Sequence, residues 1–411
     1  MLHAAMRRFA WRATRAGLVL LLVVAAACGA VRSDAPRAAL RVGISGDYPP
    51  FATRAADGSY AGFDVEVARA YAAETGRRLE LVPFRWPDLA GAITAGTFDV
   101  AMSGVTVRGD RLLVGRITAA VARADAVLLV RRGERPLRAV DHGRIAVNRG
   151  GHLERVARAK LTHAQLVVVD DNRSLPRLLA SREVDAVVTD TLEAATFPGD
   201  FEVATTLARD RKAYWTAPGR GALADDLDAW LLAREHDGTL GRLRATHLAG
   251  ARAPELPIEI ERVVDLAARR LMLMPQVAAA KRAAGLPIVD AAREGTVVAS
   301  AVARARDAGL DPGAAERLAL AQIGAARAVR EQDRGAANSA APSLPAVRSA
   351  IDALDAALLR AIVSARAATL PPTGRPALAA ALRRDADLPG FDEAHAGAIA
   401  AGIADVLRAA P

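Results

Sequence analysis

The stretch Leu40-Arg-Val-Gly-Ile-Ser-Gly-Asp-Tyr-Pro-Pro-Phe51, with the segment from Gly62 to Gly76 after it, decides the fold of the first half of the chain. Its first five residues alternate as a strand does, and the turn-forming sequence SGDYPP follows directly. The residues between the two glycines carry apolar side chains at helical spacing, and the second glycine is a helix stop. This order predicts a strand, a turn and a helix.

The same alternation of predicted strands and helices continues to residue 248. Further strands are expected at 79–82, 98–103, 126–130, 145–148, 166–170 and 186–189, and further helices at 88–95, from about residue 153, and at 175–182. Strands that alternate with helices predict an α/β unit over residues 39–248 with largely parallel sheets. Ligands of such units bind at the carboxyl ends of the strands.

Composition excludes several classes of protein. The chain of 411 residues is long enough for two or three domains, and its 52% hydrophobic and 25% charged residues exclude a disordered chain. No apolar run reaches the ~18 residues of a membrane span, which excludes a polytopic membrane protein. The charge of +9 is scattered and aromatic residues make up only 4%, so nucleic acid is not an expected partner.

Metal chemistry is not expected either. A single cysteine excludes a disulfide framework and a cysteine-based metal site. The histidines show no metal-ligand spacing and are interpreted as surface or loop residues: His142, His152, His163, His236 and His247.

Lysine is unusually rare in this chain. Of 55 basic residues only Lys160, Lys212 and Lys281 are lysines. Composition bias explains the skew, but a lysine that remains is weak evidence that a compact ammonium group is needed. Lys160 is interpreted as a solvated surface residue.

Residues 1–30 have the features of an export signal. Four arginines and no acid precede the apolar run Gly17 to Ala27, which is too short for a membrane anchor. Cys28, directly after it, stands where a lipoprotein carries its lipid, and ordinary cleavage after an Ala-x-Ala sequence is the alternative. We expect an exported, periplasmic protein, with a lipid on Cys28 as its one link to a membrane.

A change of pattern marks a second unit. Residues 249–257 are rich in small residues and proline and predict a linker. Residues 258–411 lose the strand pattern and predict an all-α domain, with helices at 258–284, about 291–308, about 313–332, 345–368, 375–385 and 391–409. Pro275 is expected to kink the first of these helices. Each side has its own core pattern, so we expect the two units to fold separately.

Residues 39–248 resemble the type II periplasmic solute-binding fold in its amino-acid-binding branch. The resemblance rests on Gly46 to Phe51, Gly62 to Val65, Phe98 to Gly104 and Thr189-Asp190. It implies two lobes that close on a small anion, with Ser103, Thr106 and Arg111 as a carboxylate clamp. A guanidinium fork with hydroxyl donors suits a planar carboxylate.

Other details are similar to one enzymatic branch of that fold, the periplasmic cyclohexadienyl dehydratases: Trp86-Pro87, Asn148-Arg-Gly-Gly151, Asp170 to Asn172, Thr189-Asp190-Thr-Leu-Glu193 and Arg211-Lys212-Ala-Tyr214. The resemblance implies that Glu193 is the general acid and that Lys212 lies in the pocket. Further pocket residues are expected at Tyr48, Phe51, Trp86, Asn148, Gly151 and Asp190. The chain departs from the family at His152, where threonine is usual. It also departs at Arg108-Gly109, in the loop 103–111 that carries the clamp residues (the clamp loop), because the family's clamp loop is less basic.

The chemistry of prephenate requires such groups. A carboxylic acid with a raised pKa protonates the leaving hydroxyl, and cationic and amide donors hold the two carboxylates. Aromatisation drives the loss of water and carbon dioxide, so neither a metal nor a cofactor is needed.

Six segments of the second unit carry a further resemblance: Val264 to Leu271, Val277 to Lys281, Leu286 to Glu294, Gly309 to Pro312, Gln322-Ile323 and Arg348 to Asp352. On these segments, residues 258–411 resemble the secreted, all-helical chorismate mutases. The resemblance implies that Arg270, Lys281, Arg293 and Arg348 are cationic site residues, accompanied by Asp290 and Glu294 in the turn and helix that follow. Two positions depart from the family: Ala326 replaces a usual Asn, Ser or Thr, and Arg330 replaces a usual Gln or Glu. Catalysis of this pericyclic reaction requires only a bound conformer and stabilisation of charge on the ether oxygen. Arg330 is a second donor beside Lys281, a solvent-facing residue, or a residue that impairs the site.

The two resemblances together predict an exported bifunctional enzyme of phenylalanine biosynthesis. One domain would convert chorismate to prephenate, and the other prephenate to phenylpyruvate, with arogenate to phenylalanine as a further reaction left open. The rival interpretation is a lipid-anchored receptor for an amino acid or related anion, with a non-catalytic helical module. Glu193 and Lys212 separate the two hypotheses, because a receptor needs no acid. The sequence leaves a homo-oligomer open.

Overall fold

The computed structural model describes residues 37–134, 142–251, 254–333, 341–370 and 374–408. The expected export signal and Cys28 lie outside these residues. In the part of the chain that is described, no helix has the length and apolar character to cross a membrane.

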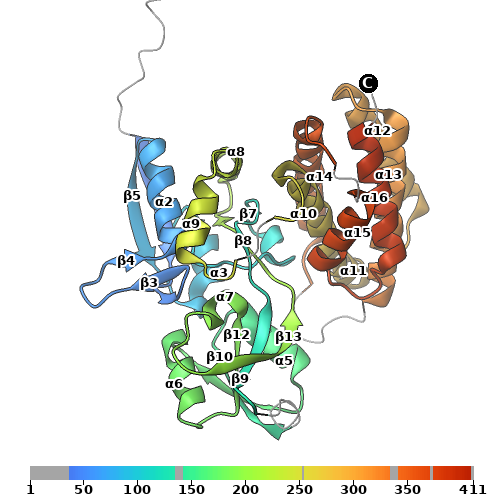
Figure 1. Cartoon of the computed structure of the whole chain (residues 1–411). Coiled ribbons are helices and arrows are strands. Elements are labelled where there is room, and N and C mark those ends of the chain that lie inside the picture. Colours follow the sequence, from blue (N-terminus) through green and yellow to red (C-terminus); the bar gives the residue numbers. More distant parts are fainter. Residues whose placement is uncertain (1–36, 135–141, 252–253, 334–340, 371–373, 409–411) are drawn as a thin grey trace, which may run out of the picture. The chain divides into compact units, whose positions relative to one another are not determined.

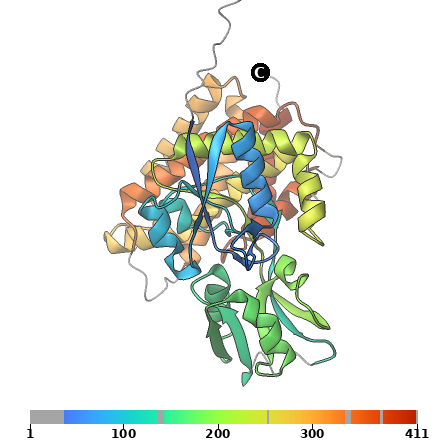
Figure 2. The same ribbon diagram turned by 90° about the vertical axis from the view of Figure 1, so that its left-hand side faces the viewer.

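The first lobe of the α/β unit is built on a five-stranded sheet in the order β5-β1-β6-β15-β7. Its two edge strands, β5 and β7, are labelled in Figure 1. Strands β1 and β6 are parallel, and β15 runs antiparallel to β6 and β7. Helix α2 packs against β5 (Figure 2). The elements of this lobe are β1 (Arg37–Ile44), β2 (Asp47–Tyr48), β3 (Ala52–Arg54), β4 (Tyr60–Ala61), α2 (Phe63–Glu74), β5 (Arg77–Pro83), η1 (Trp86–Asp88), α3 (Leu89–Thr94), β6 (Val100–Ala101), η2 (Arg111–Leu113), β7 (Arg116–Ile117), β15 (Trp215–Thr216), α8 (Gly221–His236) and α9 (Thr239–His247).

The second lobe has a five-stranded sheet in the order β11-β10-β12-β9-β13. Strand β10 is parallel to β11 and β12, whereas β9 is antiparallel to β12 and β13, so the expected largely parallel sheet is in fact mixed. Alternate residues of β9 pack on α5 and on α6, which therefore cover opposite faces of the sheet. Its elements are β9 (Ala126–Arg131), β10 (Arg144–Asn148), α5 (His152–Lys160), β11 (Gln165–Val169), η3 (Asn172–Ser174), α6 (Leu175–Ala180), β12 (Ala186–Asp190), α7 (Thr191–Ala194) and β13 (Phe201–Ala208).

Two short strands connect the lobes. The chain leaves the first sheet through β8 (Ala122–Arg123) and returns through β14 (Arg211–Lys212), and these two crossing strands pair antiparallel with Arg211 opposite Arg123. The sequence did not predict them, because two residues are too few to show a periodic pattern.

The second half of the described chain is all-helical, as predicted. Its helices are α10 (Ile258–Met272), α11 (Met274–Ala283), α12 (Ala291–Asp307), α13 (Pro312–Gln332), α14 (Leu344–Ala365), α15 (Gly374–Asp385) and α16 (Glu393–Arg408). The expected kink at Pro275 is a helix break at Leu273, because proline occupies the first turn of α11, where no backbone N–H is needed.

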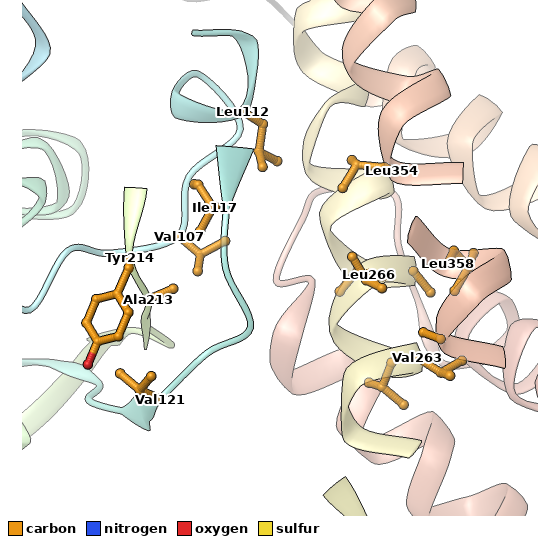
Figure 3. Packing of buried hydrophobic residues seen from close by; sticks show 14 of the residues in the cluster. Val107, Leu112, Ile117, Val121, Ala213, Tyr214, Val263, Leu266, Leu354 and Leu358 are labelled. Atoms are coloured by element: carbon orange, nitrogen blue, oxygen red, sulfur yellow. The ribbon is translucent and has the colours of Figure 1, made fainter. Parts of the chain in front are cut away.

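One hydrophobic cluster runs through both halves of the chain. Leu112 and Ile117 of the first lobe belong to the same cluster as Leu266 of α10 and Leu354 of α14 (Figure 3). We expected the two units to fold separately, each around its own core, and this shared cluster was not part of that expectation. Cutting the chain at residues 249–257 would expose apolar surface on both sides.

Candidate functional site

The first candidate site lies where strand ends of the two lobes meet. Its cavity is small, about 20 Å³, which is room for roughly one water molecule. Seven predicted residues line it: Tyr48, Trp86, Thr106, Arg111, Asn148, Gly151 and Lys212. A six-membered ring does not fit this space, so a substrate of that size requires the lobes to move apart.

Lys212 is the centre of the polar contacts in this site. Its ammonium group is only 1% exposed and donates to the hydroxyls of Tyr48 and Thr106, each at 3.1 Å. The carboxylate of Asp190 lies 3.2 Å away and also accepts a hydrogen bond from the Tyr48 hydroxyl. A buried cation with these partners is fixed in position.

Glu193 follows Asp190 in the first turn of α7. The Asp190 side chain caps this turn by accepting from the backbone N–H of Glu193 at 2.9 Å. The Glu193 carboxyl is fully buried, and one of its oxygens accepts from the Thr189 hydroxyl at 2.6 Å. Burial, and then the negative charge of Asp190, raise the pKa of Glu193 well above its usual range. This environment favours the protonated form of the acid.

Arg111 is a cation without an acidic partner in the described part of the chain. Its guanidinium donates to the carbonyl of Thr106 at 2.7 Å and lies 5.4 Å from the ring centre of Trp215. Burial, and then the nearby charge of Arg108, lower the pKa of Arg111 to about 9. The group is therefore still charged at neutral pH and can receive an anion.

Four predicted residues do not line the free cavity: Phe51, Ser103, Asp190 and Glu193. Phe51 packs under Tyr48, with ring centres 5.4 Å apart. The Ser103 hydroxyl is bonded to that of Ser45 at 2.9 Å. Close packing also explains Gly104 in the clamp loop, because a Cβ there would lie 2.6 Å from the ring of Tyr48.

Several buried polar atoms around this cavity have no partner within the described chain. They are the side-chain amide nitrogen of Asn148, the side-chain oxygen of Asn172, the Nδ1 of His152 and one oxygen of Glu193. Unpartnered buried polar atoms are rare in folded proteins. Their concentration here indicates a site that receives a polar ligand.

The interpretation of His152 as a surface or loop histidine was wrong. It is the first residue of α5 and lines the cavity, and its Nε2 lies 2.8 Å from the buried carboxylate of Asp210. The sequence offered one signal, which is the position of His152 directly after the strand-end segment 148–151. Asn172 was also missed as a cavity residue, although it follows the end of β11.

The second candidate site is a cavity of about 190 Å³ within the helical domain. Every predicted residue of this domain lines it: Arg270, Lys281, Asp290, Arg293, Glu294, Arg330 and Arg348. Ala326 lines it as well. Cations from α10 through α14 thus surround one space, which suits a small dianion.

Lys281 is largely buried at this cavity and donates to the carbonyls of Pro287 and Ile288 at 3.0 and 2.9 Å. Burial, and then the charge of Arg330, lower the pKa of Lys281. Its contacts fix the ammonium group to the turn before α12.

Arg330 lines the cavity and is paired with Glu294 at 3.0 Å. Its Nε is buried without a partner among the described residues, and burial lowers its pKa. Two other side chains of α13 could donate to an ether oxygen, but Glu331 is exposed and Gln322 lines a neighbouring cavity. Arg330 therefore faces the cavity and not the solvent.

The remaining cations of this site differ in exposure. Arg270 is buried and paired with Asp355 at 2.8 Å, a partner that the sequence gave no reason to choose. Arg293 and Arg348 are exposed at the edge of the cavity, and the Asp290 side chain caps α12 by accepting from the N–H of Arg293. No metal-binding group of three or more His, Cys, Asp or Glu side chains occurs among the described residues.

Two family models match the chain. Residues 40–250 match the bacterial extracellular solute-binding proteins, family 3, and residues 261–331 match chorismate mutase type II.

Three curated proteins are similar to parts of the chain. A cyclohexadienyl dehydratase of Pseudomonas aeruginosa is 34% identical over 161 residues, which is 38% of this chain and 60% of that protein. The L-cystine-binding protein TcyJ of Escherichia coli is 26% identical over 162 residues, 38% of this chain and 61% of that protein. A secreted chorismate mutase of Mycolicibacterium smegmatis is 33% identical over 144 residues, 33% of this chain and 80% of that protein. The chain thus spans about three fifths of the first two relatives.

Proposed function

The chain belongs to the bacterial extracellular solute-binding proteins of family 3 and continues into a chorismate mutase of type II, and from this premise we propose that it is an exported bifunctional enzyme. Its helical domain converts chorismate to prephenate, and its solute-binding domain converts prephenate to phenylpyruvate. Both substrates are small dianions, which suits two cavities that are lined by cations.

The helical cavity supports the first reaction by binding and charge alone. In the proposed reaction Arg270, Arg293 and Arg348, which line the cavity, hold the two carboxylates and so favour the reactive conformer. As the ether bond breaks, negative charge grows on its oxygen, and Lys281 and Arg330 supply donors to it. No proton transfer or covalent intermediate is required.

Glu193 is the observation that carries the second reaction. In the proposed step its proton passes to the ring hydroxyl of prephenate, the C–O bond breaks and water leaves. The electrons of the bond to the ring carboxylate flow into the ring, which becomes aromatic as carbon dioxide leaves. A buried acid with a raised pKa, joined through Asp190 to Lys212, suits this role.

The second candidate function is a receptor that binds an amino acid or related anion without changing it. The similarity to the L-cystine-binding protein favours it, as do the carboxylate-binding features around Arg111. A receptor accounts for Arg111 as a carboxylate-binding residue, but it leaves the buried acid Glu193 without a function.

Incubation with purified prephenate tests the dehydratase half directly. The enzyme hypothesis requires phenylpyruvate to form in the presence of wild-type protein, with arogenate tested in parallel. Binding of prephenate in calorimetry without any product would favour the receptor.

We also propose that residues 1–30 direct export and that Cys28 receives a lipid. The similarity to a solute-binding family and to a secreted mutase supports export. Mass spectrometry of the mature protein tests the lipid on Cys28.

A further inference from the structure

Three consecutive residues of the chain, Asp210, Arg211 and Lys212, have different neighbours. Asp210 is bonded to His152 of the second lobe, and Lys212 is bonded to Tyr48 and Thr106 of the first. Successive side chains of a strand point to opposite sides. Arg211 accordingly points away from the cavity, toward the helical domain.

Within the described part of the chain, the hydrogen bonds and ion pairs of the Arg211 side chain are all with the helical domain. Its guanidinium is 5% exposed and pairs with Asp265 of α10. It also donates to the backbone carbonyl of Asp385 at 3.0 Å and lies 3.3 Å from the sulfur of Met272. A buried guanidinium with this set of partners has a fixed position, and so does the strand that carries it.

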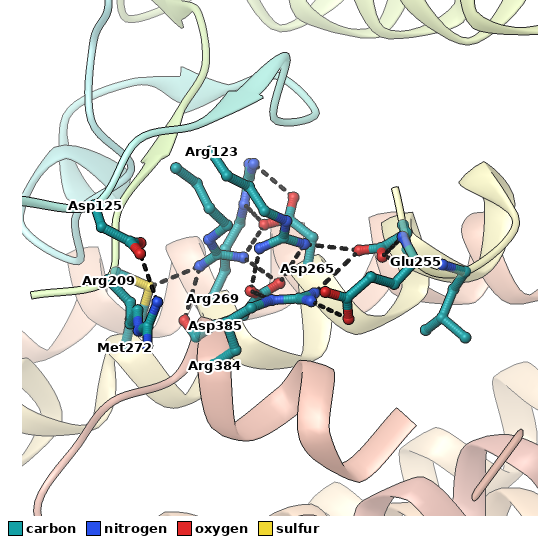
Figure 4. Close-up of polar contacts among 12 residues, drawn as sticks. Arg123, Asp125, Arg209, Glu255, Asp265, Arg269, Met272, Arg384 and Asp385 are labelled. Carbon is teal, nitrogen blue, oxygen red and sulfur yellow. Dashed lines mark hydrogen bonds and ion pairs between the residues drawn. The ribbon is translucent and has the colours of Figure 1, made fainter. Parts of the chain in front are cut away.

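The other crossing strand shares one of these acids, Asp385. Arg123, opposite Arg211, pairs with Asp385 (Figure 4). It also pairs with Glu261 of α10 at 2.7 Å. Burial opposes ionisation of Asp385, but Arg211 and Arg123 together lower its pKa. The acid is therefore charged over the whole neutral range and holds both strands at once.

Two further contacts join the helical domain to the first lobe. Arg269 of α10, 1% exposed, donates to the carbonyls of Ile117 and Thr118 at 2.7 and 2.6 Å. The Thr118 hydroxyl in turn accepts from the N–H of Tyr214, two residues beyond Lys212.

In the clamp loop, the backbone of Gly109 packs on the end of α10. A Cβ at this position would lie 2.3 Å from the carbonyl oxygen of Met272. The Arg108-Gly109 departure from the dehydratase pattern therefore falls where the helical domain meets the loop that carries Arg111.

We propose that Arg211 is a positioning residue and that, through its contacts with Asp265 and Asp385, the helical domain holds Lys212 and the clamp loop in place for the dehydratase site. The inference rests on the proposed dehydratase function of that cavity. The mutase domain then has a second role besides its own reaction. It contacts the two crossing strands, which must rearrange whenever the lobes move apart.

The test compares two glycine variants of the full-length protein. Gly109→Ala forces the clamp loop away from Met272, while Gly91→Ala on α3 is its control, since a Cβ there meets nothing within 4 Å. We expect Gly109→Ala to lower kcat for prephenate about tenfold or more, because small displacements of positioned groups are costly, while the mutase rate stays within twofold of wild type. Equal dehydratase rates for Gly109→Ala and Gly91→Ala would overturn the inference.

A second pair of variants probes the ion pairs. Arg211→Gln should lower kcat for prephenate more than Arg211→Lys, which keeps the charge. Arg384→Gln is the control, because Arg384 belongs to the same network but, among the described residues, pairs only with Glu255 of the linker and with Glu261 and Asp385 of the helical domain. A folded Arg211→Gln protein with a wild-type dehydratase rate would also overturn the inference.

Failure of the proposed function gives a different result, namely that wild-type protein converts no prephenate. Hydrogen exchange then provides the readout. We expect the amides of residues 211–216 to exchange at least tenfold faster in Gly109→Ala than in wild type or Gly91→Ala, and equal exchange would contradict the positioning.

Discussion

Arg211 and Asp265 form a buried ion pair between a strand that crosses from one lobe to the other and the first helix of the mutase domain. The residue after Arg211 is Lys212, which lines the proposed dehydratase cavity, and Arg270, five residues after Asp265, lines the proposed mutase cavity. The two candidate sites are thus connected by one strand and one helix. The two successive activities that we propose would therefore share a structural core rather than only a linker.

Replacement of Glu193 by glutamine tests the general acid. Glu193→Gln keeps the size and the buried position of the side chain but cannot give up a proton at neutral pH. We expect dehydratase turnover to fall ~10²–10⁴-fold, the usual range for acid–base catalysis, while prephenate binding and the mutase rate hardly change. Glu183→Gln, at an exposed position, is the control. A loss of less than threefold would remove Glu193 from its role.

The raised pKa of Glu193 predicts the sign of a pH dependence. Burial and Asp190 place its pKa in the folded protein above the unfolded value, so the protonated form is retained at higher pH than in a free glutamate. Its contribution to stability is complete below the unfolded pKa and is lost as the pH rises through the folded pKa. Dehydratase kcat should fall over that upper window, as measured from about pH 5 to 9. A rate that rises throughout this range would contradict the assignment.

Arg111→Lys tests the carboxylate fork. A point ammonium cannot make two parallel hydrogen bonds to one carboxylate, so we expect prephenate to bind about tenfold more weakly or worse. Isothermal calorimetry measures the change, with the exposed Arg132→Lys as the matched control. Equal affinities for the two variants would show that the fork has been misplaced.

Variants of Arg330 test whether this residue is a working hydrogen-bond donor or one that impairs the mutase site. If Arg330 donates to the ether oxygen, Arg330→Ala should lower mutase turnover by ~10²-fold or more, and activity should be flat from about pH 5 to 8. Arg327→Ala is the control, because Arg327 also pairs with Glu294 but does not line the cavity. A higher rate for Arg330→Gln would instead identify arginine as harmful. A neutral Arg330→Ala beside a severe Lys281→Ala would exclude Arg330 from the mechanism.

Much of the candidate sites could be predicted from the sequence because the relevant residues occur in short, recognisable segments. The scarcity of lysine was informative: Lys212 and Lys281 are buried in the two sites, whereas Lys160 is exposed. Helix boundaries in the second half were predicted closely, since caps and prolines mark them locally, as Asp290 does for α12.

The contacts between the two halves could not be predicted in this way. Arg211 and Asp385 are separated by 174 residues, and nothing near either residue indicates the other. Asp385 resembles any acid at a helix end. His152 was misinterpreted for the same reason, because its partner Asp210 comes from a distant segment of the chain. Long-range ion pairs depend on the completed fold and leave no periodic signal.

The conversion of chorismate to phenylpyruvate by the single purified chain tests the central claim most directly. Chorismate is added to wild-type protein, and ultraviolet absorbance is followed beside a sample without protein. The two-site account predicts loss of chorismate and accumulation of phenylpyruvate, with Glu193→Gln stopping at prephenate and Lys281→Ala leaving chorismate unconverted. Chorismate that stays at the level of the protein-free sample, or prephenate that accumulates with wild-type protein, would contradict it.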